Sequence, residues 1–199
     1  MSEVVLDPGP LPVGPYDKKG SGWWGVICLI ATEASLFGYL LFSYYFFDFQ
    51  SPHSWRPPDP PKLHLSAPDT VVLLLSSVAV WFGESQLKKD RPGRALGGML
   101  VGFALGVVFV VVQLFEWKSK TFSPQSDPYG SLYFTITSFH LAHVVVGLIA
   151  LLFVSIWLRL GYFDSQRNAA VSNAAVYWHF VDAVWLAVFF TFYISPYLW

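Results

Sequence analysis

The sequence predicts an all-α membrane protein, a polytopic bundle in which five helices cross the lipid bilayer. Of its 199 residues, 54% are hydrophobic and only 13% are charged, whereas charged residues make up about 25% of a typical soluble domain. Five apolar runs also reach the ~20 residues that a helix needs to cross hydrocarbon about 30 Å thick. Membrane barrel strands alternate in polarity over about 10 residues, and these runs do not. Helices are therefore the structure that satisfies their backbone hydrogen bonds in lipid.

The predicted spans, in chain order, cover about residues 23–47, 68–87, 95–116, 131–158 and 174–194. Before them, residues 1–22 contain four prolines and no apolar run, which predicts an extended, proline-rich N-terminal tail. Residues 23–199 then form a single transmembrane domain. The connection over about 48–67 is also rich in proline, and we expect it to be extended.

Basic residues predict the orientation of the bundle. Eight lysines and arginines lie in the N-terminal tail and in segments 88–94 and 159–173, against four in the other connections. Because loops rich in lysine and arginine stay in the cytoplasm, the N-terminus is predicted to be cytoplasmic and the C-terminus to lie on the opposite side. The net charge of −1 leaves no basic surface for a nucleic acid, so we expect no such partner.

Small residues mark a packing face on the third span. Gly98, Gly102 and Gly106 are spaced four apart, which places them on one stripe of a helix. Such a stripe allows close approach of a neighbouring helix, because association in lipid depends on packing. The neighbour could belong to this chain or to a partner subunit. Gln113 and Glu116 follow at the end of the same span, where polar residues are ordinarily in contact with water.

The first span contains one ionisable residue, Glu33. It lies ten residues into the span, which at 1.5 Å per residue is roughly 15 Å deep and near the middle of the bilayer. One interpretation is a protonated carboxyl group that is hydrogen-bonded to another helix. The other is a group that handles protons or contacts a lipid headgroup, since burial favours the neutral form of a carboxyl in both cases.

The last two spans each carry a pair of ionisable residues. His140 and His143 are three residues apart in the fourth span, as are His179 and Asp182 in the fifth. This spacing places each pair on one helical face, and groups of this kind in lipid need partners. The pattern predicts a polar network between the two helices. At the end of the fourth span, Arg159 is placed to contact a lipid phosphate.

A metal site is the alternative to this network. Di-iron bundles use Glu-x-x-His pairs, and the sequence contains none. A haem held by histidines from two helices remains an alternative. No nucleophile–base pair, phosphate-binding loop or cysteine cluster is present. We therefore expect no catalytic residue and no metal ligand in this chain.

Three blocks of sequence carry a resemblance to a known family. The first begins with Trp24-Gly25-Val26 and runs to Glu33. The second is Tyr129-Gly130-Ser131 followed by residues 139–147 (FHLAHVVVG), and the third is residues 177–185 (YWHFVDAVW). In these blocks the chain resembles subunit III of the haem–copper terminal oxidases, in the five-helix form found in bacteria. Ser138 and Ala142 stand where the second block of the family has glycines.

The resemblance implies a subunit without a redox centre in a proton-pumping cytochrome c oxidase of the bacterial inner membrane. Haem and copper would reside in subunits I and II, and other respiratory subunits are further partners. This chain would pack on subunit I, hold phospholipid, and support proton uptake and sustained turnover. Longer family members have two more N-terminal helices, which form one arm of a lipid-holding cleft. Glu33 would be the buried carboxyl, and the polar network would comprise His140, His143, His179 and Asp182.

Three other functions are alternatives. Within the family, these are the matching subunit of a quinol oxidase and an accessory protein of nitric oxide reductase. Outside it, a small proton-coupled transporter would use Glu33 and the histidine and aspartate residues. Transporters commonly contain paired repeats with broken helices, and no repeat is visible in this sequence.

Overall fold

The structure is a computed structural model that describes residues 20–50, 55–57 and 63–198. Within these residues the regular structure is entirely helical. Five long helices, a π-helical turn and a short 3₁₀ turn follow one another: α1 (Ser21–Gln50), α2 (Leu63–Lys88), α3 (Pro92–Ser119), α4 (Pro128–Arg159), α5 (Ala169–Phe189), η1 (Phe190–Ile194) and η2 (Ser195–Tyr197). The five long elements, the last one extended through its two turns, are apolar and long enough to cross a membrane, which confirms the predicted fold class.

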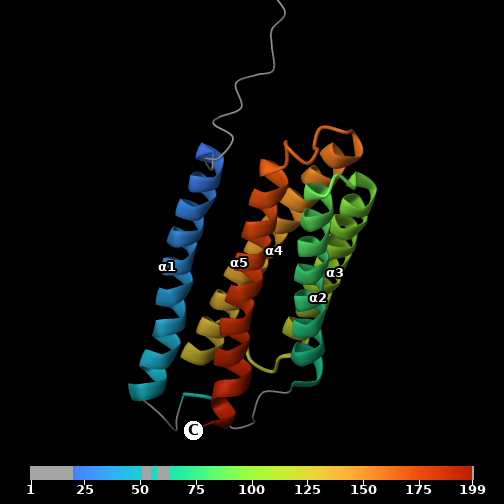
Figure 1. Ribbon diagram of the computed structural model, residues 1–199. Coiled ribbons are helices and arrows are strands. Elements are labelled where there is room, and N and C mark those ends of the chain that lie inside the picture. Colours follow the sequence, from blue (N-terminus) through green and yellow to red (C-terminus); the bar gives the residue numbers. More distant parts are fainter. Residues whose placement is uncertain (1–19, 51–54, 58–62, 199) are drawn as a thin grey trace, which may run out of the picture.

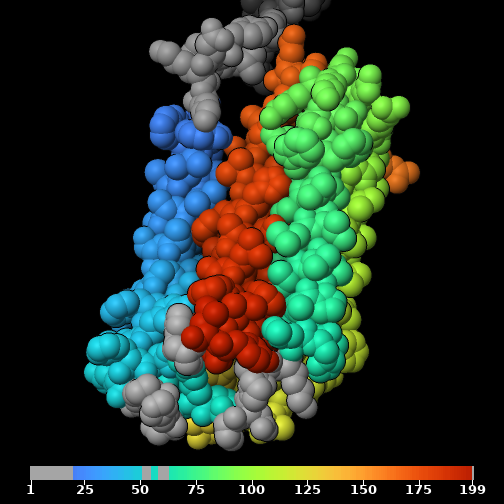
Figure 2. All heavy atoms as spheres, turned by 60° about the horizontal axis from the view of Figure 1, so that its bottom comes forward, coloured from blue at the N-terminus to red at the C-terminus, as the bar shows by residue number. Residues whose placement is uncertain are grey.

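The helices run up and down as one bundle, and α1 stands at its edge (Figure 1). The start of α1 and the α2–α3 and α4–α5 connections lie at one end, here called the N-terminal end. The chain finishes at the other end, here called the C-terminal end. Figure 2 shows α5, in red, between α1 in blue and α2 in green. Helix α5 is therefore the central element that joins α1 to α2. The direction of the bundle in the membrane stays a prediction.

Helices α1 to α4 extend at both ends beyond the apolar spans predicted for them, whereas α5 begins before its predicted span but ends at Phe189, with the π-helical turn η1 completing the span to Ile194. Helix α1 begins at Ser21, so residues 21–22 are helical instead of belonging to the predicted tail. The tail up to residue 19 lies outside the described residues. The predicted extended connection over 48–67 is also too long, because α1 continues to Gln50 and α2 already begins at Leu63. Pro68 lies within α2, near enough to its start that the missing N–H removes a hydrogen bond from the end of the helix and not from its middle.

The ends of α4 follow from local sequence. Asp127 precedes the helix, and its carboxylate accepts a hydrogen bond of 2.6 Å from the backbone N–H of Gly130. Pro128 occupies the first helical position, where a missing N–H costs nothing. At the other end, Gly161 has a φ of +81°, a left-handed conformation that commonly ends helices and favours glycine.

The glycine stripe of α3 packs against helices of the same chain. A Cβ atom at Gly98 would lie 2.7 Å from the Cα of Gly83 in α2. At Gly102 it would lie 2.5 Å from a methyl group of Val80, and at Gly106 2.7 Å from the ring of Trp178 in α5. These distances are too short for a real side chain. The two backbones of α2 and α3 therefore touch, and the close contacts of all three glycines are internal.

Candidate functional site

Glu33 of α1 and His143 of α4 form a polar pair between these two helices. The Nε2 atom of His143 lies 3.0 Å from a carboxylate oxygen of Glu33. The Nδ1 atom of His143 lies 2.7 Å from the carbonyl oxygen of Phe139. Because a carbonyl oxygen only accepts, Nδ1 carries a hydrogen and donates it there. A single further proton is then shared between Nε2 and Glu33, and wherever it resides the pair has no net charge.

This pair is not fully buried within the chain. The side chains of His143 and Glu33 are 16% and 25% exposed. The ring of Phe37 meets the imidazole edge-on at a centroid distance of 5.1 Å, and the hydroxyl of Tyr177 lies 3.4 Å from the carbonyl oxygen of His143. A neutral pair of this kind is inexpensive in a low-dielectric environment, unlike an isolated carboxylate.

His140 occupies a separate, fully packed position. Its side chain is 1% exposed, and Nε2 lies 3.1 Å from the carbonyl oxygen of Val181 in α5. Nε2 must therefore be the donor, while Nδ1 has no partner among the described residues. The ring packs between Phe109 and Trp185, at centroid distances of 5.8 Å and 4.9 Å. His140 joins α4 to α5 as a neutral imidazole.

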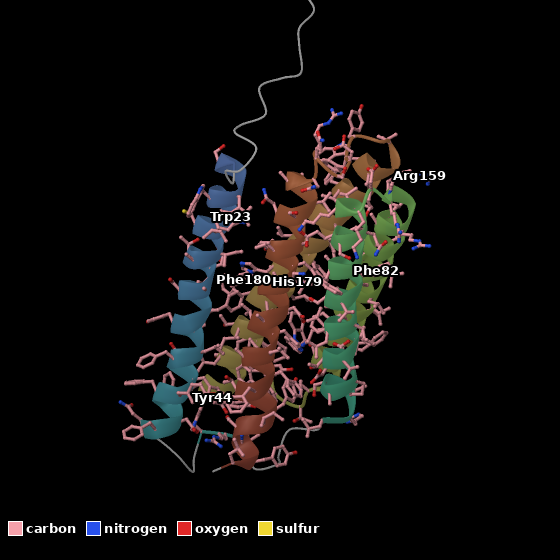
Figure 3. All side chains as sticks on the ribbon, in the orientation of Figure 1. Trp23, Tyr44, Phe82, Arg159, His179 and Phe180 are labelled. Atoms are coloured by element: carbon pink, nitrogen blue, oxygen red, sulfur yellow. The ribbon has the colours of Figure 1, made fainter. Side chains whose placement is uncertain are left out.

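His179 and Asp182 face α2 instead of α4. The Nδ1 atom of His179 lies 3.1 Å from the hydroxyl of Ser77, and the same hydroxyl is close to the carboxyl group of Asp182. Figure 3 shows His179 on the side of α5 that faces α2. The structure thus does not gather the four predicted residues into one network on the last two helices. A three-residue spacing fixes a shared face, but not which neighbour that face meets.

The contact between α2 and α5 is instead a series of hydrogen bonds along the length of both helices, here called the α2–α5 ladder. Its rungs are Ser172 to Glu84 at 2.7 Å, His179 to Ser77 at 3.1 Å, Trp178 to Ser76 at 3.1 Å and Trp185 to Thr70 at 2.9 Å. The two helices are antiparallel, so partners later in α5 lie earlier in α2. Ser172 and His179, seven residues apart, meet residues seven apart in α2, whereas Trp178 and Trp185 meet residues six apart. Each polar side chain of α2 in the ladder therefore has its partner within the chain.

Near the C-terminal end, a buried polar cluster was missed by sequence reasoning. Gln113 and Glu116, which were expected to contact water, are only 1% and 2% exposed. Glu116 is 2.9 Å from Nζ of Lys120 and accepts a hydrogen bond from the hydroxyl of Tyr193. That hydroxyl lies 2.8 Å from the one of Tyr133. The signal was present in the sequence, because Gln113 continues the stripe of Gly98, Gly102 and Gly106 at helical spacing.

Neither a metal cluster nor a contact of Arg159 is apparent in the part of the chain that the structure describes. There, no three histidine, cysteine, aspartate or glutamate side chains lie close enough together to hold a metal ion. Arg159 is exposed at the end of α4. In Figure 3 it lies at the opposite edge of the N-terminal end from Trp23, so it is distant from α1 and its contact with a lipid phosphate stays a prediction.

An apolar groove lies between the first part of α1 and helices α4 and α5. It has a volume of about 400 Å³ and lies between Val26 and Leu29 of α1, residues such as Phe153 and Trp157 of α4, and the start of α5. Tyr177 also lines it, which connects the groove to the Glu33–His143 pair. The lining is hydrocarbon almost throughout, so the groove suits an apolar occupant and not an ion.

Comparison with known proteins identifies the family. The sequence profile of cytochrome c oxidase subunit III matches residues 18–199. Cytochrome c oxidase subunit 3 of Thermostichus vulcanus is 29% identical over 174 residues, which cover 85% of each chain. The protein of the same name from Mus musculus is 30% identical over 192 residues, covering 93% of this chain and 72% of the relative. That from Locusta migratoria is 30% identical over 185 residues, covering 88% and 68%. With five membrane-crossing helices and a match along nearly its whole length, this chain belongs to the cytochrome c oxidase subunit III family.

Proposed function

We propose that the chain is the subunit III, without a redox centre of its own, of a proton-pumping oxidase that takes electrons from cytochrome c. The observation that carries this proposal is the family match over residues 18–199, with relatives named for cytochrome c oxidase. In this proposal, haem and copper reside in partner subunits I and II, and the complex works in the bacterial inner membrane. The relatives' names favour cytochrome c over quinol as the electron donor.

The internal chemistry of the bundle supports a structural role. Glu33 and His143 bind each other, His140 binds a backbone carbonyl, and His179 binds Ser77. Side chains engaged in this way hold helices together and are not arranged around a vacant ligand position. The proposal therefore assigns this chain the assembly and maintenance of the oxidase, while other chains carry the electron transfer.

The surface of α1 supports contact with further molecules. Tyr39, Phe42 and Phe49 are 70%, 63% and 90% exposed in the single chain. In a membrane, lipid or protein covers such side chains, and close packing is the main gain from protein contact. Within the proposal, subunit I is the direct partner, and lipid fills what protein does not cover.

The groove beside α1 is the proposed lipid position. Its apolar lining fits the acyl chain of a phospholipid, and Tyr177 joins it to the Glu33–His143 pair. Arg159 is distant from α1 (Figure 3), so a phosphate bound there would belong to a different lipid. In the proposal, the Glu33–His143 pair holds α1 at the distance from α4 that the lipid needs. It also supports proton uptake, because the placement of α1 fixes the position of subunit I.

Purification through a tag on this chain tests the proposal. In mild detergent, the chain is expected to come out with larger chains that contain haem and copper, and mass spectrometry of the intact complex identifies them. A partner subunit with a dinuclear copper site supports cytochrome c as the donor, and a partner lacking it supports the quinol alternative. Recovery of the chain alone, or only as a homo-oligomer, contradicts the subunit role and favours a transporter.

A substitution in the pair tests the structural assignment. Glu33→Ala is expected to leave electron transfer largely intact while weakening assembly, lipid retention or sustained turnover, because the residue contacts His143 and no redox group. Oxygen consumption over many turnovers, together with the lipid content of the complex, measures this. Complete loss of oxygen reduction in a fully assembled complex would contradict the assignment.

A further inference from the structure

One buried carboxyl group close to Glu116 of the buried polar cluster has no partner for either of its oxygens among the described residues. Asp69 of α2 is 2% exposed, and neither of its carboxyl oxygens has a hydrogen-bond partner among the described residues. An ionised carboxylate in this condition costs several kcal/mol, because the interior does not replace the water that it loses. By contrast, Asp48 is nearly as buried, at 7% exposed, and forms an ion pair with Arg56.

The charges around Asp69 do not supply a counter-ion for it. Glu116 of α3 is the ionisable residue close enough to act on its charge. Lys120, on the same helix, already pairs with Glu116 at 2.9 Å. Its ammonium group also stands 5.0 Å and 5.1 Å from the ring centres of Tyr133 on α4 and Tyr193 on η1. Together with Asp69, the cluster thus contains two carboxyl groups and one cation.

The buried cluster has more unpartnered acceptor oxygens than donors, because among the described residues its unpartnered donor is the amide nitrogen of Gln113. One oxygen of Glu116 accepts from Tyr193 and Lys120, which identifies Glu116 as the ionised carboxylate. Its other oxygen, Oε2, is buried without a partner among the described residues. Asp69 likewise has two oxygens and nothing that donates to them. A proton on Asp69 removes the uncompensated charge and adds an O–H donor where acceptors are in excess.

We propose that Asp69 is a proton-binding site near the C-terminal end of the bundle, where it stays a neutral carboxylic acid while Glu116 carries the negative charge. A proton is the occupant that the geometry favours over a metal ion. Hard cations need several oxygen ligands, and among the described residues no third acidic side chain joins Asp69 and Glu116. Loss of this proton would leave two carboxylates facing one ammonium group between α2 and α3.

Infrared spectroscopy of the purified complex tests the protonation state directly. The difference between the unsubstituted protein and Asp69→Asn at neutral pH is expected to contain the C=O band of one carboxylic acid. That band lies at higher frequency than the carboxylate bands, and it moves to lower frequency in D₂O. A difference that contains only carboxylate bands overturns the proposal.

A second variant makes the assignment independent of how Asp69→Asn folds. In a variant that combines Glu116→Gln with Lys120→Gln, so that no unpaired cation is left, the carboxylic acid band is expected to persist and carboxylate bands to be lost, because Glu116 is the ionised partner. Loss of the carboxylic acid band in this double variant would place the proton on the wrong residue and overturn the proposal. Thermal unfolding supplies a control: Asp69→Asn is expected to keep the unfolding midpoint, whereas Asp48→Asn, which loses the charge facing Arg56, lowers it. An equal loss in both variants also contradicts a neutral Asp69.

Discussion

Helix α1 and the pair α2–α3 show two different ways of holding helices together in a membrane. In the 18-residue apolar stretch of each helix, only 6% of the residues of α1 are buried within the chain, against 39% for α2 and 33% for α3. Helices α2 and α3 touch backbone to backbone through glycines, and the α2–α5 ladder adds hydrogen bonds. Helix α1 is attached through a few side chains, of which Phe37 and Tyr44 are buried and Glu33 is paired. The comparison indicates a rigid block of α2–α5 with α1 as an arm that other molecules support.

Substitution of a glycine in the α2–α3 contact should have the largest effect on the free energy of unfolding. Gly98→Ala places a Cβ atom 2.7 Å from the backbone of Gly83, so α2 and α3 must separate. Gly97→Ala is the matched control, since nothing lies within 4 Å of its new Cβ atom. We expect Gly98→Ala to lower the free energy of unfolding by about 3 kcal/mol, toward the upper end of overpacking effects. Thermal unfolding in detergent measures it, and equal midpoints for both variants would refute the close contact.

Removal of one hydrogen bond from the α2–α5 ladder should have the next largest effect on the free energy of unfolding. Ser76→Ala leaves the indole N–H of Trp178 buried without its acceptor. We expect a loss of about 1–2 kcal/mol, because an unpaired buried donor keeps its desolvation cost. Ser43→Ala is the control, since Ser43 of α1 is partly exposed and, within the described residues, its hydroxyl donates to the carbonyl oxygen of Tyr39. The same thermal measurement applies, and a control as destabilised as Ser76→Ala would refute the difference between the two regions.

The Glu33–His143 pair should contribute less. A double-mutant cycle with Glu33→Gln, His143→Gln and both together isolates the interaction between the side chains. We expect a coupling free energy of about 0.6 kcal/mol, the average for polar contacts within membranes. The partial exposure of both side chains agrees with a modest value. A coupling several times larger would mean that α1 is bound as firmly as the ladder binds α2 to α5.

The smallest effect concerns the α4–α5 connection, outside the spans. The backbone N–H groups of Arg167 and Gln166 donate to the Asp164 carboxylate and hold its pKa below the ordinary value. A lowered pKa means that the fold favours the ionised form, so this contribution is present near neutral pH and is lost as pH falls through the pKa of Asp164. We expect the two amide hydrogens to lose protection in acid. In Asp164→Asn, the protection of these two amides should no longer depend on pH. If the pH dependence persists in this variant, a group other than Asp164 causes it.

The sequence predicted the five helices because apolar length alone defines a membrane span. It also identified Glu33 and the histidines of the last two helices as residues that need partners, but not which partners. His143 pairs with α1 across 110 positions of sequence, and His179 meets Ser77 of α2, a residue with no distinguishing local signal. Helix neighbours are decided by packing in three dimensions, above all by where glycines allow contact. The expectation that Gln113 and Glu116 contact water is wrong, because polar residues at a span end are ordinarily exposed but these two lie on the packed side of α3, where Gln113 continues the glycine stripe.

Hydrogen–deuterium exchange of the purified complex, before and after removal of lipid, tests the two-part organisation most directly. Amides in the first half of α1, which line the groove at Val26 and Leu29, are predicted to lose protection when lipid is removed. Amides around the α2–α3 glycine contacts are predicted to keep theirs. Equal loss in both regions, or loss in α2–α3 with α1 unchanged, would contradict a rigid block with a lipid-supported arm.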